Sequence, residues 1–107
     1  MNKNIMEIIE NFSNDTKRLL QDNLIAEYLF GSFARNKETE FSDIDILIIV
    51  KHFDYKIRRK ISALSSDYSL TQSIYISPII KDLQIWKKNK EYNTLFYQEI
   101  QRDGIKL

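Results

Sequence analysis

The sequence predicts a single α/β domain in which a small mixed β-sheet is packed against helices. Residues 46–50, ILIIV, form an unbroken apolar run, which is typical of a central strand covered on both faces. Other segments carry apolar residues at three- and four-residue steps, the spacing of amphipathic helices. The resulting order of helix, strand, strand, helix, strand and further helices indicates an α/β domain. At 107 residues the chain has room for one hydrophobic core.

The first half of the chain is expected to contain one long helix and two strands. Ile5, Ile9 and Phe12 recur at helical spacing and mark one face of the helix. A short strand then runs into Gly31, and a helical turn with a polar loop separates it from the second strand. The expected ranges are 4–22 for the helix, 24–30 for the first strand, 33–41 for the turn and loop, and 43–50 for the second strand.

The second half is expected to contain a helix, a strand and two shorter helices. Asp54 is placed to cap the first of these helices, because a carboxylate there can accept hydrogen bonds from free N–H groups. Pro78 cannot donate to a neighbouring strand, so its strand is expected to lie at an edge or to end there. The expected ranges are 54–67 for the helix, 73–80 for the strand, a short helix around Leu83 and Trp86, and a last helix with Tyr92, Leu95, Phe96 and Ile100 that ends near Asp103-Gly104.

The most informative feature is Gly31-Ser32 followed, after ten residues, by Asp43-Ile44-Asp45. Side chains alternate along a strand, so Asp43 and Asp45 are expected on one face, with their Cα atoms about 6.5–7 Å apart. Two carboxylates this close repel each other, and in a partly buried site one of their pKa values rises. A divalent cation removes the conflict, and Mg²⁺ typically binds one or two carboxylates together with substrate phosphates. Asp43 and Asp45 are therefore the predicted metal-binding residues.

This spacing resembles the motif of the DNA polymerase β-like nucleotidyltransferase superfamily, which is Gly-Ser, ten residues and Asp-x-Asp. Within that superfamily, GSFAR followed by SDIDILIIV is similar to the minimal nucleotidyltransferases, small bacterial and archaeal proteins often paired with a HEPN-domain partner as toxin and antitoxin. The motif covers residues 31–50, and the order of the flanking elements extends the likeness over most of the chain. The resemblance implies that residues 1–107 are one minimal nucleotidyltransferase domain with a nucleotidyltransferase core, and that Asp43 and Asp45 are its catalytic residues.

The glycine, serine and arginine of the motif are expected to bind the nucleotide. Gly31 has no Cβ and would let backbone N–H groups approach a triphosphate. Ser32 would donate its hydroxyl to a phosphate oxygen, and a helix starting at Phe33 would direct its N-terminus at the same anion. Arg35 could pair with phosphate, or it could simply be solvated on the helical turn, and the sequence leaves both alternatives open.

Two positions depart from the family pattern. Where many relatives have glycine after the arginine, this chain has Asn36, one of the few other residues that tolerate a left-handed conformation. Active members usually carry a third carboxylate on the next strand, but residues 73–80 read SIYISPII and contain no acid. Ser73, Tyr75 and Ser77 share one face of that strand, and the missing position is expected to be one of them.

The composition argues against thiol chemistry, a membrane span and general binding of nucleic acid. The chain has no cysteine, which excludes disulfides, a thiol nucleophile and a thiolate metal site, and suits a cytoplasmic protein. No apolar stretch approaches the length of a membrane span, and Asn4, Glu7 and Glu10 interrupt the N-terminal apolar residues, which argues against a signal peptide. The net charge is +1, so there is no overall electrostatic attraction to nucleic acid.

Three hypotheses about function remain. By resemblance, the chain is a Mg²⁺-dependent enzyme that moves AMP from ATP onto a hydroxyl group of a HEPN-type toxin, which implies a hetero-oligomer of antitoxin and toxin. The absent third carboxylate favours a second hypothesis, a weakened nucleotidyltransferase fold that binds and neutralises its partner by contact. A nucleic-acid-binding accessory is supported only by local basic runs, and the near-neutral net charge counts against it. We favour the enzyme, because the Gly-Ser and Asp-x-Asp parts of the motif are both intact.

Overall fold

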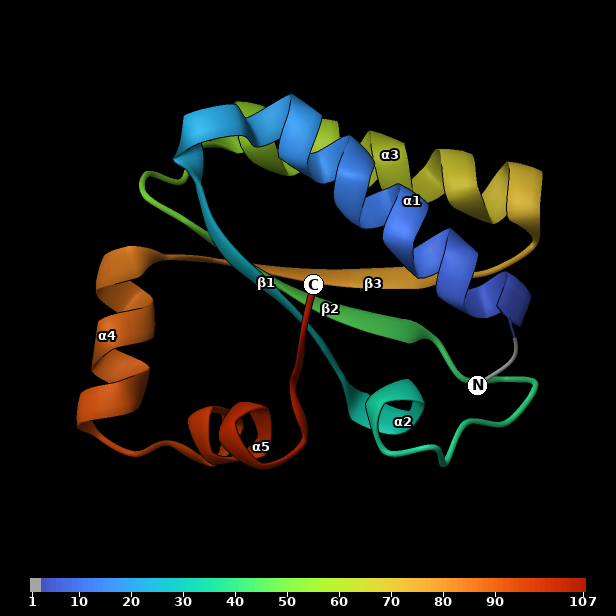
Figure 1. Ribbon diagram of the computed structural model, residues 1–107. Coiled ribbons are helices and arrows are strands. Elements are labelled where there is room, and N and C mark those ends of the chain that lie inside the picture. The colour runs from blue at the N-terminus through green and yellow to red at the C-terminus, as the bar shows by residue number, and fades with distance from the viewer. Residues whose placement is uncertain (1–2) are drawn as a thin grey trace.

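A computed structural model describes residues 3–107, and Met1 and Asn2 of the predicted domain lie outside the described residues. The elements follow the predicted order of helix, strand, strand, helix, strand and helices (Figure 1). In chain order they are α1 (Lys3–Leu20), the 3-10 helix η1 (Gln21–Asn23), β1 (Leu24–Phe30), α2 (Gly31–Ala34), β2 (Ile44–Val50), α3 (Tyr55–Gln72), β3 (Ile76–Asp82), α4 (Leu83–Glu91), α5 (Leu95–Asp103) and β4 (Ile105–Lys106). These residues form five α-helices and one four-stranded mixed sheet, which confirms the α/β class. None of the described helices is long and apolar enough to cross a membrane.

The sheet has the strand order β3-β2-β1-β4. β1 runs antiparallel to both β2 and β4, whereas β2 and β3 are parallel and are connected through α3. In this register Asp45 lies beside Phe30 of β1 and beside Ser77 of β3. The strand that carries Asp45 is therefore central, as its apolar run predicts, and β3 is an edge strand, as Pro78 predicts.

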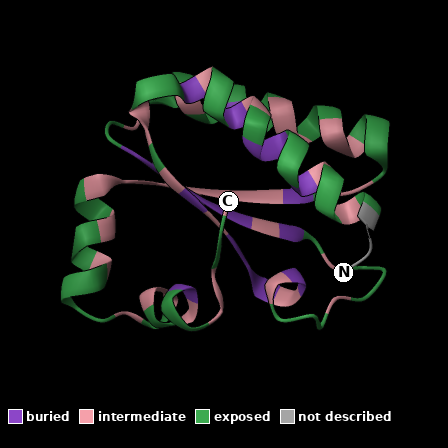
Figure 2. Cartoon of the chain, in the orientation of Figure 1, coloured by how far each residue is buried: buried purple, intermediate pink, exposed green. Residues whose placement is uncertain are grey.

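Helices cover both faces of the sheet (Figure 1). On the face of α1 and α3, the larger buried cluster contains Ile44, Ile46 and Ile48 of β2. On the face of α4 and α5, Leu47 and Ile49 belong to a smaller buried cluster. Because side chains alternate along β2, Asp45 belongs to the face of α4 and α5. Buried residues are concentrated along the central strands and the inner side of α1 (Figure 2).

A buried carboxylate lies beneath α1, on the face of the sheet opposite Asp45. Glu27 of β1 is 1% exposed and accepts hydrogen bonds from the hydroxyl of Ser13, at 2.6 Å, and from that of Thr16. Burial raises the pKa of Glu27, while these hydrogen bonds and the charge of Lys17 oppose the rise. The hydroxyls make the buried position tolerable, because a buried polar group without partners is costly.

The boundary between α3 and β3 lies further along the chain than predicted. α3 continues to Gln72, whereas the helix was predicted to end at residue 67. β3 begins only at Ile76, whereas the strand was predicted to begin at residue 73. The last turns of α3 are held by Tyr68, whose ring packs edge-on against Phe12 of α1. Ser73 then ends the helix in a left-handed conformation with a φ of 54°. The sequence around Tyr68 is mostly polar, so its helical spacing did not reveal this contact.

The starts of α3 and α2 and the presence of β4 can be compared with the sequence-based expectations. Asp54 caps α3 as predicted, accepting a hydrogen bond from the N–H of Ile57 at 2.9 Å. α2 begins at Gly31, earlier than the predicted start at Phe33, so Gly31 and Ser32 form its first turn. β4 was not predicted, because its two residues, paired with Tyr28 and Leu29 of β1, are too short for a recognisable alternation.

Candidate functional site

Gly31 and Asp45 are in direct contact, which joins the two parts of the sequence motif. Gly31 follows β1 with a φ of +75°, a conformation that only glycine adopts at little cost. A Cβ built on Gly31 would lie 2.2 Å from Oδ2 of Asp45, so glycine is needed to leave room for this carboxylate. The contact forms because β1 and β2 are paired, with Phe30 beside Asp45.

The Asp45 carboxyl has a raised pKa. Partial burial is the largest cause, followed by the negative charges of Asp43 and Glu99, while the positive charge of Arg35 opposes the shift. Asp43 is exposed and lies one residue before β2. The predicted repulsion between Asp43 and Asp45 is therefore present, and a bound cation would relieve it.

Ser32 and Arg35 lie on α2 and at its end. Ser32 is partly buried in the first turn, and the backbone N–H of Arg35 donates to the carbonyl of Gly31 at 3.2 Å. Arg35 is exposed, and its Nη1 lies 3.7 Å from Oε2 of Glu99 on α5, so the guanidinium has a charged protein neighbour. Asn36 follows with a φ of 55°, a left-handed conformation that asparagine tolerates better than most other residues.

The structure shows which residue of β3 lies beside Asp45. Ser77 is in register with Asp45 on the neighbouring parallel strand, and residues in register share a face of the sheet. Ser73 instead ends α3, and Tyr75 precedes the strand. Among residues 3–107, no group of three or more His, Cys, Asp or Glu side chains is arranged to hold a metal ion. A cation bound by the aspartates would therefore complete its coordination with substrate or water oxygens.

Glu99 is a charged neighbour of the site that the sequence analysis missed. It lies on α5, where the next residue, Ile100, is 2% exposed and packs in the buried cluster that contains Phe30 and Leu47. Its carboxylate lies near Arg35 and raises the pKa of Asp45. A glutamate on an amphipathic helix carries no motif, so only the tertiary packing of α5 reveals its place.

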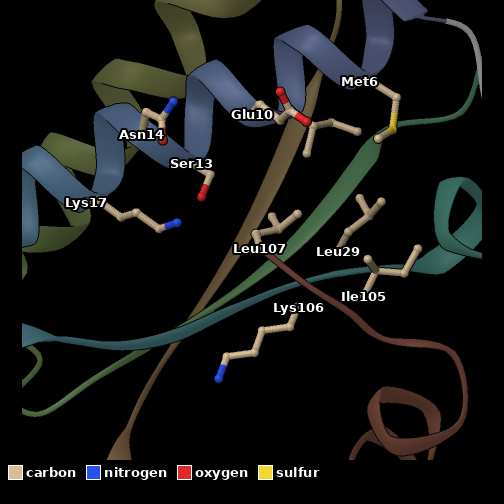
Figure 3. A pocket seen from close by; sticks show the side chains of 10 residues that line it. Met6, Glu10, Ser13, Asn14, Lys17, Leu29, Ile105, Lys106 and Leu107 are labelled. Carbon is tan, nitrogen blue, oxygen red and sulfur yellow. The ribbon is translucent and has the colours of Figure 1, made fainter.

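Two of the cavities help to delimit the site. A cavity of about 560 Å³ is lined by Asp43 and by the exposed rings of Phe41 and Tyr75. Another, of about 390 Å³, lies between α1 and the C-terminal segment, where Met6 and Leu107 contribute to its wall (Figure 3). This second cavity is on the α1 face of the sheet and includes none of the predicted site residues. The first cavity includes Asp43 alone among the predicted site residues.

The arrangement has the components of a metal–phosphate site. Asp43 and Asp45 offer the hard oxygen ligands that Mg²⁺ prefers. Gly31 leaves the backbone open beside Asp45, and Arg35 adds a guanidinium, whose planar set of donors matches phosphate. Positioning and charge stabilisation are the main contributions that a protein makes to phosphoryl transfer. The donor set therefore fits Mg²⁺ together with a nucleotide.

Solved structures share this fold. A crystal structure described as a toxin-antitoxin with AMP-PNP has a TM-score of 0.58 at 22% identity, covering 91% of this chain and 70% of the solved chain. A mutant of the toxin-antitoxin MntA-HpeT has a TM-score of 0.55 at 24% identity, covering 92% of this chain and 70% of the solved chain. At these identities the likeness establishes the fold alone.

Sequence relatives extend the likeness to the family. A protein of Methanocaldococcus jannaschii named as a putative protein adenylyltransferase, MJ0141, is 39% identical over 104 residues, covering 96% of this chain and 98% of the relative. A second protein of that organism with the same description, MJ0604, is 33% identical over 97 residues and covers 90% of each chain. The family profile described as nucleotidyltransferase domain matches residues 9–106, which include the whole motif. The resemblance predicted from the motif is thereby confirmed, and the chain belongs to the nucleotidyltransferase domain family and is a nucleotidyltransferase.

Proposed function

We propose that the chain is a Mg²⁺-dependent adenylyltransferase that moves AMP from ATP onto a hydroxyl group of a partner protein, and that it acts as the antitoxin of a HEPN-type toxin. The contact between Gly31 and Asp45 carries the proposal, because it brings a phosphate-binding turn and acidic ligands into one site. The name of the relative from Methanocaldococcus jannaschii supports a protein acceptor. The fold shared with toxin-antitoxin proteins, one of them with AMP-PNP, supports a toxin partner and an adenine nucleotide.

Each predicted site residue has one task in this proposal. The backbone of Gly31 and the hydroxyl of Ser32 bind the phosphates, and the guanidinium of Arg35 pairs with them. Asp43 and Asp45 would hold Mg²⁺. When bound, this ion would neutralise phosphate charge and align the α-phosphate. The acceptor hydroxyl loses its proton to water as its oxygen forms the new bond to the α-phosphorus, and pyrophosphate leaves with the electron pair of the broken bond between the α-phosphorus and the bridging oxygen.

A contact-only antitoxin is the second candidate, and Ser77 is the observation that favours it. This serine lies beside Asp45 on β3, the strand on which active relatives usually carry a third carboxylate. No carboxylate of β3 is therefore next to the aspartates to receive the proton of the acceptor hydroxyl. In this alternative the chain binds nucleotide and neutralises its partner without transferring AMP.

Transfer can be tested with ATP labelled at the α-phosphate, with Mg²⁺, in the presence and absence of the product of the adjacent gene. We expect label on that partner protein and none after chelation of the metal with EDTA. Asp43→Asn and Asp45→Asn should each reduce labelling by about 100-fold or more, since partners one step further from a metal already contribute about 10–100-fold. Asp67→Asn, which neutralises an exposed carboxylate on α3, should label the partner as well as the unmodified chain does.

The outcomes separate the two candidates. No label on any protein, despite a stable complex with the partner, would favour the contact-only antitoxin. Full transfer by Asp45→Asn would refute the metal assignment. Urea unfolding serves as the control for folding, because neither aspartate belongs to the buried clusters of the core and both variants should remain folded.

A further inference from the structure

Glu99 is held beside the proposed phosphate-binding residues by the packing of α5. Figure 1 places α2 and α5 on the same side of the sheet. Phe96, one turn before Glu99, packs edge-on against Phe30 with ring centroids 5.3 Å apart, and Ile100 is buried after it. These apolar contacts anchor the helix on both sides of Glu99. The carboxylate therefore approaches Arg35 from a fixed element and not from a loop.

The distance between the two charged groups indicates a loose pair. Nη1 of Arg35 and Oε2 of Glu99 are 3.7 Å apart, whereas a charge-assisted hydrogen bond is about 2.7–2.9 Å long. The side chains are 39% and 30% exposed, and ion pairs with such exposure contribute little to the stability of a fold. This pair therefore contributes little to the stability of the fold. Its position beside Asp45 instead suggests a role in the proposed nucleotide site.

We propose that Glu99 is a positioning residue for the nucleotide, acting through Arg35. Glu99 restricts the long arginine side chain to the end of the site next to Asp45, and the guanidinium keeps donors for the triphosphate because it has five N–H groups. This inference rests on the proposed nucleotide site and names a residue that determines its affinity.

Glu99 has two opposing effects on nucleotide binding: it repels the phosphates, and it orders the side chain of Arg35. Its negative charge disfavours a triphosphate, but the positive charge of the neighbouring guanidinium offsets it, and both side chains are partly exposed to solvent, which weakens the repulsion. A free arginine side chain, in contrast, must lose most of its rotamer freedom when it binds a phosphate, and this loss is among the largest of any side chain. We expect the ordering of Arg35 to outweigh the repulsion, so that Glu99 strengthens nucleotide binding.

A double-mutant cycle tests whether Glu99 acts through Arg35. The chain, Glu99→Gln, Arg35→Gln and the double variant are titrated with α,β-methylene ATP and Mg²⁺ in a calorimeter, because this analogue cannot be cleaved at the bond that transfer breaks. Glu99→Gln should weaken binding about three- to tenfold, the low end of the range for coupled neighbours. In the Arg35→Gln background the same change should alter Kd by less than about twofold, since energies of independent sites add within a few tenths of a kcal/mol.

Two further measurements exclude a merely structural role. Without nucleotide, Glu99→Gln should unfold at the same temperature as the unmodified chain, because the pair is loose and partly exposed. In the transfer assay the KM for ATP should rise by the factor found for Kd, while kcat changes by less than about twofold, since removal of uniform binding raises KM alone. Glu91→Gln, which changes an exposed carboxylate on α4, is the matched control and should leave both constants unaltered.

The inference and the proposed function fail in different ways. Unchanged or tighter nucleotide binding by Glu99→Gln, or an equal loss in the Arg35→Gln background, would overturn the role of Glu99 while leaving transfer intact. Coupled nucleotide binding without any label on the partner would support the role of Glu99 and overturn the proposed transfer. An unmodified chain that binds no nucleotide at all would overturn both.

Discussion

Gly31 combines a left-handed backbone conformation with a close approach to the carboxylate of Asp45. Its φ of +75° and the 2.2 Å separation between a Cβ and Oδ2 of Asp45 impose two separate penalties on any side chain. Gly31→Ala should lower the free energy of unfolding by about 1–2 kcal/mol, the cost of a left-handed conformation for an L-residue. It should also abolish AMP transfer, because Asp45 must turn away from the new methyl group. Urea unfolding and the labelling assay measure the two effects.

A variant of matched stability separates these effects. Ile61 is buried in the core on the α1 and α3 face, and Ile61→Val should cost about 0.5–1.5 kcal/mol without moving Asp45. If Ile61→Val loses as much transfer as Gly31→Ala, the loss reflects stability and the argument from the Asp45 contact fails. Retained transfer by Ile61→Val would assign the loss in Gly31→Ala to the displaced carboxylate.

At the scale of residues, sequence reasoning worked wherever a side chain's role depends on near neighbours in the chain. The left-handed conformation of Asn36 follows from the rarity of other residues that tolerate it, and it is present. The close approach of Gly31 to Asp45 was not predicted, because it follows from the pairing of β1 with β2. The place of Glu99 depends instead on how α5 packs against Phe30 and Leu47, and no local pattern encodes that packing.

At the scale of elements, the parallel pairing of β2 and β3 determines what lies beside Asp45. Ser77 is in register with it, so Ser77→Asp would place a third carboxylate on the same face of the sheet. A positioned general base contributes about 100- to 10,000-fold to proton transfer, so even an imperfectly placed carboxylate at this position should raise kcat for AMP transfer about tenfold. Single-turnover labelling at saturating ATP and Mg²⁺ measures this change.

The matched control for this prediction is Ser77→Asn, which has nearly the shape of aspartate but no charge. In EDTA, Ser77→Asp should also unfold at lower urea concentration than Ser77→Asn, because three like charges then share one partly buried site. Equal transfer rates for the two variants would show that the lack of a carboxylate on β3 does not limit the enzyme.

The ends of elements were predicted where a capping residue marks them and missed where tertiary contacts decide. Asp54 marks the start of α3 through its hydrogen bond to Ile57, and the sequence shows it directly. The end of α3 depends on the contact between Tyr68 and Phe12, which lie far apart in the chain. β4 exists because the segment after α5 returns to the edge of β1, and a two-residue strand has no periodicity of its own.

At the scale of the whole molecule, the sheet separates a partly buried acid, Asp45, from a fully buried one, Glu27. Asp45 is partly buried on the face of α4 and α5, whereas Glu27 is 1% exposed under α1 on the other face. Both have raised pKa values, with burial as the largest cause. In the proposed site a bound cation would relieve the unfavourable charge of Asp45, whereas the Glu27 carboxyl has two hydroxyl groups as its hydrogen-bond partners.

The raised pKa of Glu27 makes the stability of the whole chain dependent on pH in a predictable direction. Above the ordinary glutamate value of 4.5, the unfolded chain loses this proton while the folded chain still binds it. The free energy of unfolding therefore falls as pH rises from there through the folded pKa, and this contribution is constant above it. Glu27→Gln cannot titrate, so its stability relative to the unmodified chain should increase with pH over the same window. Ser13→Ala removes a hydrogen bond that lowers the pKa of Glu27. In this variant the pH range over which the free energy of unfolding falls should therefore extend to higher pH. Urea unfolding from about pH 4, below the ordinary glutamate value, to about pH 8 measures all three proteins. A constant difference between Glu27→Gln and the unmodified chain would contradict the prediction.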